Sequence, residues 1–262
     1  MPFNERNSVE HYIIHQLTGI NLNTTEVKEP KQIYGAEWAY TAAKALQCGI
    51  NEVLVEPNLK KALIRLNPEI KAQPERADEV IHTLRTILIS VNQTGLVRAN
   101  EKFFSWLTNE KTMPFGKNNS HRPVRLIDFD DPANNEYLVT NQFYIHHRET
   151  KIPDVVLLIN GIPVVVGEAK TPSRPSVSWL DGAHDIHHIY ENSVPMLFVP
   201  NILSFATEGK ELFYGPIRCP LEFWAPWRTE DSNTALEKSL GLAEIGRELN
   251  DLFHPPPKTP NT

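Results

Sequence analysis

Three residues near the middle of the chain have the types and spacing that metal-assisted hydrolysis requires. Asp154 follows a proline, and Glu168 and Lys170 stand fourteen and sixteen residues further on. Two apolar runs flank Asn160-Gly161 between them, which is a strong β-hairpin signal. We expect Asp154 at the start of one strand, and Glu168 and Lys170 at the end of the other. Side chains two residues apart on a strand leave the same face.

Two carboxylates that converge at the base of a hairpin form a hard oxygen site suited to Mg²⁺. Such a metal lowers the pKa of a bound water and stabilises charge on a phosphorane. A neighbouring Lys can orient or deprotonate that water, or stabilise the transition state. The alternative is that the three side chains only solvate a hairpin end, because strand ends are often charged.

The turn at Asn160-Gly161 creates a geometric problem for this site. A two-residue type I′ turn there would pair Ile159 with Ile162. Directly opposed residues share a face, and faces alternate along a strand. Continued to the hairpin base, that regular register would place the side chain of Asp154 on the face opposite to that of Glu168.

A shared metal therefore requires the pairing to shift by one residue, so that Asp154 lies opposite Glu168. The shift can come from a three-residue loop at 160–162 or from a β-bulge. Pro163 fits either, since it cannot donate in a regular ladder, and Gly167 is a natural bulge position. The sequence predicts an irregularity between residues 154 and 168.

A further carboxylate, Glu10, lies within an apolar helix face. Asn7 is predicted to begin a helix, with Glu10 at capping-box spacing. On a helical wheel Glu10 falls within the apolar arc of Val9, Ile13, Ile14 and Leu17. A carboxylate there must be paired or must bind something. The local possibility is an ion pair with His11 or with a Lys at the sheet edge.

A cluster of histidines follows the hairpin. His184 and His188 are four residues apart, which suits two metal ligands on one helix. A third ligand with recognisable spacing is absent from the sequence. Solvent-exposed histidines are therefore the preferred interpretation over a metal cluster.

Hydrophobic periodicity predicts the elements that position these residues. Helices are expected over residues 37–47, 57–67, 76–91, 99–107, 178–190 and 236–253, and strands over residues 124–129, 137–146, 154–159, 164–170, 195–199, 203–207 and 211–214. Loops are expected over residues 21–34 and 171–176, a turn at Glu208-Gly209, and a linker-like tail over residues 255–262. The short connections between the later strands indicate an α/β domain with a mixed or antiparallel sheet, and with a helical insert at about residues 57–120.

Composition narrows the class of protein. The chain has 262 residues, of which 40% are hydrophobic and 22% charged, as is ordinary for a globular protein. A net charge of −6 argues against a protein that binds DNA strongly through electrostatic attraction alone. The two cysteines, Cys48 and Cys219, indicate a reduced cytoplasmic protein. The sequence shows no signal segment and no apolar run of membrane-spanning length.

The segment NQFYIHHRETKIPDVVLLINGIPVVVGEAKTPS resembles the N-terminal region of the restriction subunit of type I restriction enzymes. The matching positions are Asn141, Gln142, Phe143, Asp154, Asn160, Gly161, Ile162, Pro163, Glu168 and Lys170. A second segment, VPMLFVPNILSFATEGKELFYG, also resembles the family, as do the following aromatic residues Phe223, Trp224 and Trp227. The helical insert matches at residues 62–68 and 100–103.

This resemblance implies a restriction-endonuclease-like fold of the PD-(D/E)xK class. It implies that Asp154, Glu168 and the backbone carbonyl of Ala169 hold Mg²⁺, and that Lys170 assists the attacking water. It gives Tyr190 a catalytic role in positioning. Nucleases resembling this fold often present a first-helix carboxylate to the metal, which makes Glu10 an additional candidate ligand.

The resemblance also implies partners. Double-stranded DNA would be cleaved after translocation by a helicase-like motor that uses ATP, within a complex that contains specificity and methyltransferase subunits. The chain has no G-x-x-x-x-G-K-[ST] motif for the motor. We therefore expect a nuclease domain at residues 1–254 of a fragment or split-gene product, with the motor in cis or in trans. The rival interpretation is a catalytically silent docking module, which would have no reason to retain Asp154, Glu168 and Lys170.

One position departs from the family pattern. The family follows the E-x-K strand with a helix that bears Q-x-x-x-Y. The tyrosine corresponds to Tyr190, but Ile186 stands at the glutamine position. Asp185 and His187 flank Ile186 and are the candidates to substitute for glutamine. The alternative for Tyr190 is a core aromatic residue with a satisfied hydroxyl.

Overall fold

The structure is a computed structural model that describes residues 9–23, 37–171 and 176–227. Except for Trp227, these residues belong to one compact unit, Met1–Pro226. Asn7, most of the predicted loop at 21–34, the predicted helix at 236–253 and the tail at 255–262 lie outside the described residues. The boundaries of the nuclease domain therefore stay predictions.

A seven-stranded mixed sheet forms the centre of this unit, with the order β1-β4-β7-β8-β9-β10-β11. Its strands are β1 (Ala39–Tyr40), β4 (Tyr137–Asn141), β7 (Val155–Ile159), β8 (Ile162–Ala169), β9 (Leu203–Thr207), β10 (Leu212–Gly215) and β11 (Ala225–Pro226). β1 runs parallel to β4 and β8 runs parallel to β9, whereas the other neighbouring pairs are antiparallel. The mixed α/β architecture predicted from the sequence is confirmed, and it is that of a restriction-endonuclease-like fold.

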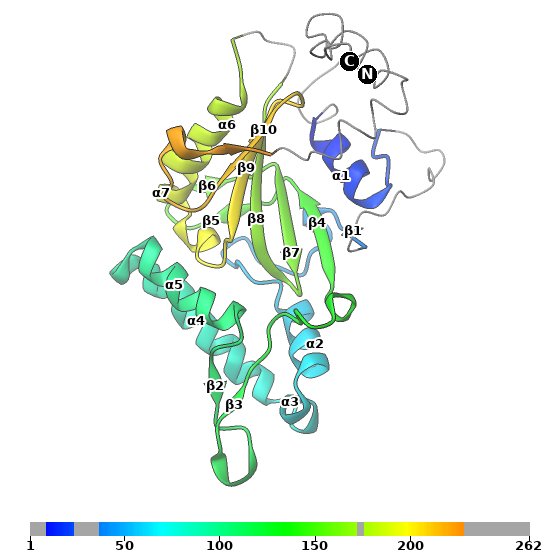
Figure 1. Cartoon of the computed structure of the whole chain (residues 1–262), viewed down its shortest axis with the longest axis vertical. Coiled ribbons are helices and arrows are strands. Elements are labelled where there is room, and N and C mark those ends of the chain that lie inside the picture. Colours follow the sequence, from blue (N-terminus) through cyan, green and yellow to red (C-terminus); the bar gives the residue numbers. More distant parts are fainter. Residues whose placement is uncertain (1–8, 24–36, 172–175, 228–262) are drawn as a thin grey trace, which may run out of the picture. The chain divides into compact units, whose positions relative to one another are not determined.

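Helices cover the sheet on both sides. α1 (His11–Thr18) packs beside β1 and β4. The connection from β8 to β9 consists of α6 (Trp179–His184), a π-helix (Asp185–Tyr190), α7 (Glu191–Ser193) and a 3₁₀ turn (Pro195–Phe198). α6 packs on β8 and β9, as Figure 1 shows. The predicted helix at 178–190 is confirmed as a helical run, although its second half is not α-helical.

A helical segment lies beyond the turn of the β7–β8 hairpin (Figure 1). It contains α2 (Glu56–Leu66), α3 (Pro68–Ala72), α4 (Arg76–Thr94) and α5 (Leu96–Leu107). Three of these helices were predicted, and α3 was not. A small hairpin of β2 (Thr112–Met113) and β3 (Arg122–Pro123) follows, and another pairs β5 (Ile145–His146) with β6 (Thr150–Lys151). None of the described helices is long and apolar enough to cross a membrane.

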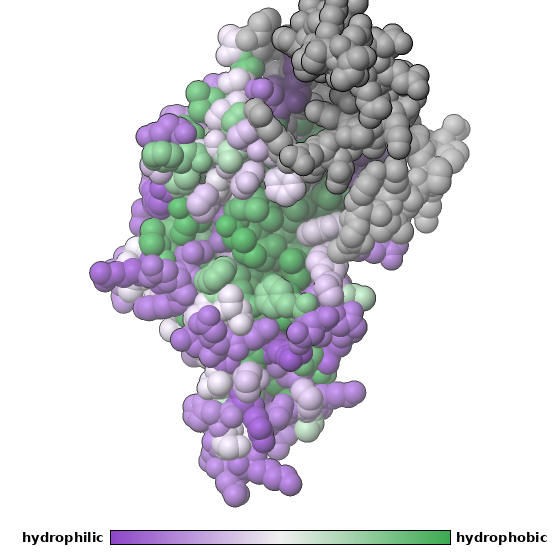
Figure 2. Space-filling view, viewed as in Figure 1, coloured by the Kyte–Doolittle hydropathy of each residue, from purple (hydrophilic) through white to green (hydrophobic). Residues whose placement is uncertain are grey.

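Two apolar clusters lie on the two faces of the sheet. The larger one unites the helical segment, α6 and one sheet face, and its largest fully buried side chains include Leu59, Leu63, Leu84, Phe103, Leu158, Ile162 and Phe198. The smaller one joins α1 to the other face through Ile14, Val139, Val155 and Phe205. In Figure 2, hydrophobic residues gather over the centre of the sheet, and hydrophilic residues cover much of the helical segment and the β2–β3 hairpin.

The β7–β8 hairpin contains the predicted irregularity. Ile159 pairs with Ile162 across a turn in which Asn160 and Gly161 both have positive φ, at 52° and 79°, as a type I′ turn requires. The register then shifts between Leu157 and Leu158. Val155 consequently pairs with Gly167, which places Asp154 opposite Glu168, as a common site demands.

The shift arises because Val164 has no partner of its own in the register, since the residues on either side of it, Pro163 and Val165, pair with neighbouring residues of β7. Gly167, the other position considered for a bulge, sits in regular pairing. A Cβ atom at Gly167 would lie 2.1 Å from the Phe205 ring, so the glycine serves close packing instead.

Three predicted elements were wrong. Residues 37–47 contain β1 and a 3₁₀ turn (Ala43–Ala45) instead of a helix, because the segment lies along the edge of β4, where Thr41 N donates to Val139 O at 3.1 Å. Residues 124–129 form no strand, because the Asn67 side chain bonds to both backbone groups of Arg125. Asn67 Nδ2 donates to the Arg125 carbonyl, and the Arg125 N–H donates to Asn67 Oδ1.

The third error is at residues 195–199, where a 3₁₀ turn replaces the predicted strand. The Asn100 side chain donates to the carbonyls of Val199 and Asn201, which satisfies backbone groups that a sheet would otherwise use. The predicted strand at 137–146 also divides. β4 stops at Asn141 because Gln142 takes a positive φ of 53°.

Candidate active site

Asp154 stands immediately before β7, and both of its carboxylate oxygens are held. The backbone N–H of Ala169 donates to Oδ2 at 2.9 Å, and Gln142 Nε2 donates to Oδ1 at 3.0 Å. Burial, followed by repulsion from Glu10, raises the pKa of Asp154 to about 7. The carboxylate is thus fixed in place, and a cation bound beside it would stabilise its charged form.

Glu168 lies on β8 across from Asp154 and is 4% exposed. Its Oε1 accepts hydrogen bonds from Lys170 Nζ at 2.9 Å and from the Tyr190 hydroxyl at 3.2 Å. Its Oε2 is buried and has no hydrogen-bond partner within the part of the chain that the structure describes. Burial, followed by repulsion from Asp154, raises the pKa of Glu168 to about 8. An unpartnered buried carboxylate oxygen is costly, and a cation is the ligand that would offset the cost.

Lys170 lies between two carboxylates. Its Nζ is 2.9 Å from Glu168 Oε1 and 2.6 Å from Asp185 Oδ2. Burial acts to lower the pKa of Lys170, but the attraction of Glu168 and the bond to Asp185 outweigh it and raise that pKa. The side chain is therefore a held ammonium group at the edge of the two carboxylates.

Tyr190 and Asp185 reach the site from the connection between β8 and β9. α6 begins with a capping box formed by Ser178 and Asp181. Gly182 lets the helix approach β8 closely, since a Cβ there would lie 3.3 Å from Glu168 O. Burial and the nearby carboxylate of Glu168 raise the pKa of the Tyr190 hydroxyl, which thus remains a hydrogen-bond donor.

Glu10 is 2% exposed and lies beside Asp154. Its oxygens accept from Asn141 Nδ2 at 3.2 Å and from Gln142 Nε2 at 3.0 Å, and Tyr40 donates to the amide oxygen of Asn141 at 2.9 Å. Because Gln142 Nε2 donates to Glu10 and Asp154 together, one amide links the two carboxylates.

Sequence reasoning gave no role to Gln142 or Asn141, although both were part of the family resemblance. Their place at the end of the strand that precedes the Pro-Asp segment was the signal available. The reversal of the chain at Gln142, which brings its side chain between two acids, has no simple sequence signature. Asp185 was one of two candidates to substitute for the family's glutamine, and the structure places it on Lys170.

Metal ligands are limited to a small set. In the described ranges, no three His, Cys, Asp or Glu side chains come together as a metal-binding group. Asp154 and Glu168 therefore need a further oxygen, and the Ala169 carbonyl is the predicted one. An extended residue directs its N–H and C=O to the same side, so this carbonyl faces the side on which Asp154 lies. The rings of His184 and His188 lie 4.7 Å apart on the outer side of the helical run.

Residues 2–218 match the family model described as the N terminus of the type I restriction enzyme R protein. The chain belongs to this family. Its family membership confirms the resemblance drawn from the hairpin motif and the segments around it.

Two relatives of this R protein N terminus match most of the chain. The type I restriction enzyme HindI endonuclease subunit of Haemophilus influenzae is 27% identical over 227 residues, which cover 85% of this chain and 21% of the relative. A Methanocaldococcus jannaschii protein, provisionally named as the type I restriction enzyme MjaIXP endonuclease subunit, is 22% identical over 240 residues, which cover 89% and 21%. The chain spans about one fifth of the length of these relatives.

The structure shows where Ile186, the residue that departs from the family pattern, lies relative to the site. Ile186 is fully buried in the larger apolar cluster and makes no contribution to the polar site. Asp185 stands in the polar site in its stead. Of the two flanking candidates, His187 lies toward Glu191, with Nδ1 at 3.8 Å from Glu191 Oε2.

Proposed function

We propose that this R protein N terminus is a metal-dependent endonuclease domain that hydrolyses phosphodiester bonds of double-stranded DNA. The observation that carries the proposal is the pair of buried carboxylates, Asp154 and Glu168, on one sheet face beside Lys170. The names of the relatives, endonuclease subunits of type I restriction enzymes, support the same substrate class.

The residues present fit Mg²⁺. Asp154, Glu168 and the Ala169 carbonyl would hold it, and the unpartnered Glu168 Oε2 is the strongest sign of a cation position. When bound, Mg²⁺ supplies a low-pKa water and charge stabilisation for phosphoryl transfer. Glu10 would support Asp154 from behind, and its role as a direct ligand stays a prediction.

The chain's own residues then have distinct tasks. Ala169 N–H and Gln142 fix the orientation of Asp154. Lys170 presents an ammonium N–H to the attacking water or to a phosphate oxygen, while Tyr190 holds Glu168 Oε1 through its hydroxyl. We infer that Tyr190 keeps Glu168 turned toward the metal position and does not itself transfer a proton, because its pKa is raised.

We propose that cleavage occurs within a restriction complex, because the relatives are named as subunits of type I restriction enzymes. As the family resemblance implies, this complex would contain specificity and methyltransferase subunits, and a motor that hydrolyses ATP would move the DNA before cleavage. The relatives are about five times as long as the matched region, which leaves room for such a motor in them. Mg²⁺ is the proposed cofactor of this chain, and ATP would act only at the motor.

Cleavage of a plasmid by the chain combined with the other components of its restriction system tests this proposal. Asp154→Ala, Glu168→Ala and Lys170→Ala should each abolish cleavage and leave ATP hydrolysis intact. Asp78→Ala, which removes an exposed carboxylate that pairs with Lys60, serves as the control and should cleave normally. Near-full cleavage by any one of the three site variants would show that its residue has been given the wrong role.

A further inference from the structure

The helical run after β8 contains a rare π-helical turn at the site. The turn covers Asp185–Tyr190, and the backbone N–H of Glu191 donates to Ile186 O, five residues earlier. A π turn closes backbone hydrogen bonds between residues five apart, whereas an α-helix closes them between residues four apart, so a π turn accommodates one extra residue. Asp185 and Tyr190, which are five apart, both contact the β8 residues of the site, whereas Ile186, four before the tyrosine, lies in the larger apolar cluster.

The burial of the two competing residues agrees with this geometry. Ile186, four before Tyr190, is 0% exposed and packs in the apolar core. Asp185 keeps a side-chain exposure of 30% and directs Oδ2 to Lys170 Nζ at 2.6 Å. One extra residue in the turn thus brings an acid to the site and sends an isoleucine to the core.

Three polar contacts connect four side chains in a row. Asp185 binds Lys170, Lys170 binds Glu168 Oε1, and Tyr190 donates to that same oxygen. Asp185 and Tyr190 come from the π turn, and Glu168 and Lys170 come from β8. An ammonium group has three N–H donors, of which these contacts use two. The third remains for a water or for a phosphate oxygen.

We propose that Asp185 is a positioning residue for Lys170, and that the π turn exists to bring Asp185 to the site in place of Ile186. Asp185 holds the ammonium group against Glu168 and sets the direction of its third N–H. This inference rests on the proposed nuclease function for its catalytic consequence, but the positioning itself is a property of the chain without metal or DNA.

Chemical reactivity of Lys170 in the metal-free chain measures the positioning directly. Acetylation of Lys170 under limiting reagent is quantified by mass spectrometry against the exposed Lys117 in the same sample. Asp185→Ala should raise the relative rate about fivefold, the size expected for a partly exposed ion pair. Asp185→Asn, which keeps an oxygen acceptor, should give an intermediate rate. Asp181→Asn removes an acid from the same helical run and should leave the rate unchanged.

The π turn has its own test. Deleting His188, an exposed residue of the turn, shortens the spacing from Asp185 to Tyr190 to four residues, so a regular α-helix would again stack the two side chains. Lys170 should stay protected in this deletion variant and become reactive when Asp185→Ala is added. A reactive Lys170 in the folded single deletion, with native circular dichroism, would overturn the role given to the π turn.

The outcomes separate this inference from the proposed function. If Asp185→Ala leaves Lys170 as protected as in the native chain, the positioning role is overturned, whatever the nuclease assay shows. If Lys170 becomes reactive and the reconstituted complex loses cleavage rate without weaker DNA binding, both proposals are supported. If Lys170 becomes reactive and the native complex does not cleave DNA, positioning holds and the nuclease proposal fails.

Discussion

At the scale of single residues, the site is a cluster of buried acidic side chains. Glu10, Asp154 and Glu168 are each at most 9% exposed, and the neighbours repel one another. Among the described residues, Lys170 and amide and hydroxyl donors offset part of that repulsion. Buried like charges of this kind are retained where a ligand uses them, because burial without compensation is unfavourable.

The two raised pKa values predict how stability depends on pH. A carboxyl whose pKa rises on folding binds its proton more tightly in the folded state, so its stabilising contribution is present below its ordinary pKa and is lost as the pH rises through the folded value. For Asp154 and Glu168 that window runs from about 4 to about 8. We expect the melting temperature of the metal-free chain to fall across it.

Asp154→Asn removes one of the two repelling charges and should flatten this dependence. At pH 8 the metal-free variant should be as stable as the native chain or more stable, and added Mg²⁺ should raise the melting temperature of the native chain only. Thermal unfolding at pH 5, 6, 7 and 8, with and without Mg²⁺, measures both effects. A steeper decline in the variant would mean that Asp154 is a structural carboxylate.

Gln142 links Glu10 to Asp154, and we expect both carboxylates to depend on it for their hydrogen bonding. Gln142→Gly removes the amide without straining the left-handed backbone, and the loss of hydrogen bonds to two buried carboxylates should cost about 1–3 kcal/mol of unfolding free energy. Gln142→Ala should cost more than Gln142→Gly, because alanine keeps the Cβ that the native glutamine already holds at positive φ, whereas glycine relieves that strain. Urea unfolding at pH 8 measures both variants, and equal stability of Gln142→Gly and the native chain would contradict the linking role.

Sequence reasoning reached the site residues unevenly. Asp154, Glu168 and Lys170 were found because their spacing around a hairpin turn is local information. Asn141 and Gln142 acquire their contacts with Glu10 only through the fold, since the two segments are more than 130 residues apart. Long-range pairing of this kind has no signature in the spacing of residue types.

At the scale of elements, the hairpin shows what geometry alone can establish. The need for two carboxylates on one face required a register shift, and the structure has one. The position of the register shift within the hairpin could not be predicted from this requirement. Gly167 suits a bulge by its backbone freedom, but the Phe205 ring occupies the space where a Cβ would be, so the extra residue is accommodated at Val164.

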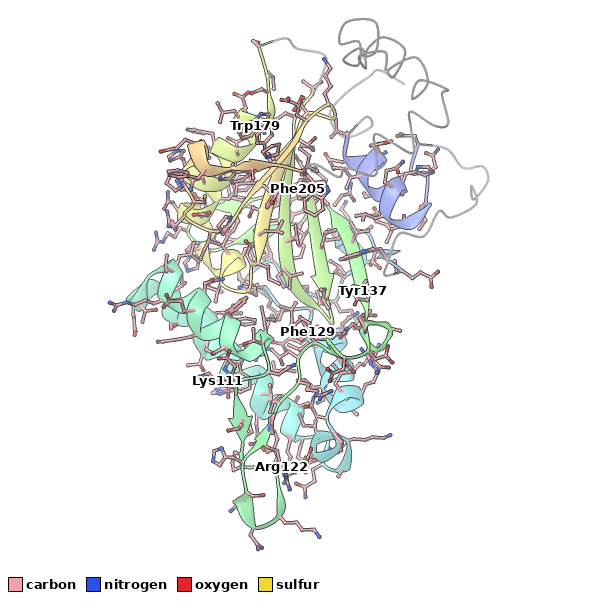
Figure 3. The ribbon with its side chains drawn as sticks, in the orientation of Figure 1. Lys111, Arg122, Phe129, Tyr137, Trp179 and Phe205 are labelled. Carbon is pink, nitrogen blue, oxygen red and sulfur yellow. The ribbon has the colours of Figure 1, made fainter. Side chains whose placement is uncertain are left out.

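Gly167→Ala tests this close packing next to Glu168. The new methyl group would meet the ring of Phe205, which Figure 3 labels on β9 beside β8, and overpacking should cost about 1–3 kcal/mol of unfolding free energy. Adding Phe205→Leu should recover part of the loss. Gly49→Ala is the matched control, because the nearest atoms to its Cβ would belong to the flexible end of the Glu52 side chain. Chemical denaturation distinguishes the cases, and an unaffected Gly167→Ala variant would contradict the packing.

For the other elements, prediction from the sequence succeeded for the long helices and failed for the short segments. The long helices α2, α4 and α5 were predicted because a sustained apolar stripe is an unambiguous signal. The short segments at 124–129 and 195–199 were not, because the side chains of Asn67 and Asn100 bind their backbone groups, and the segment at 37–47 was not, because its backbone pairs with the distant strand β4. The π turn also escaped prediction, because the spacing of apolar residues at 179, 183, 186 and 190 is compatible with an α-helix.

At the scale of the whole molecule, charge and length bear on the proposal that this domain acts with partner subunits. The chain carries a net charge of −6, and its site adds local negative charge where the DNA backbone would have to approach. The phosphate contacts that release counterions, and so dominate affinity for DNA, are made by lysine and arginine side chains. The curated relatives are much longer than the matched region, so the surfaces that hold DNA are expected in their remaining parts and in the other subunits.

This balance predicts how the isolated chain behaves with DNA. Fluorescence anisotropy with labelled duplexes should show weak binding that has no sequence preference and falls steeply between 50 and 200 mM salt, because only non-specific phosphate contacts are available. Mg²⁺ should strengthen binding to the native chain by reducing the charge of the carboxylate site, whereas Glu168→Ala should respond less. Since the Ala variant also lacks one negative charge, Glu69→Ala, which removes a carboxylate on the helical segment, provides the control for charge alone. Tight binding that persists in high salt and discriminates between duplex sequences would instead assign DNA recognition to this domain itself, and the division of work between the chain and its partner subunits would have to be revised.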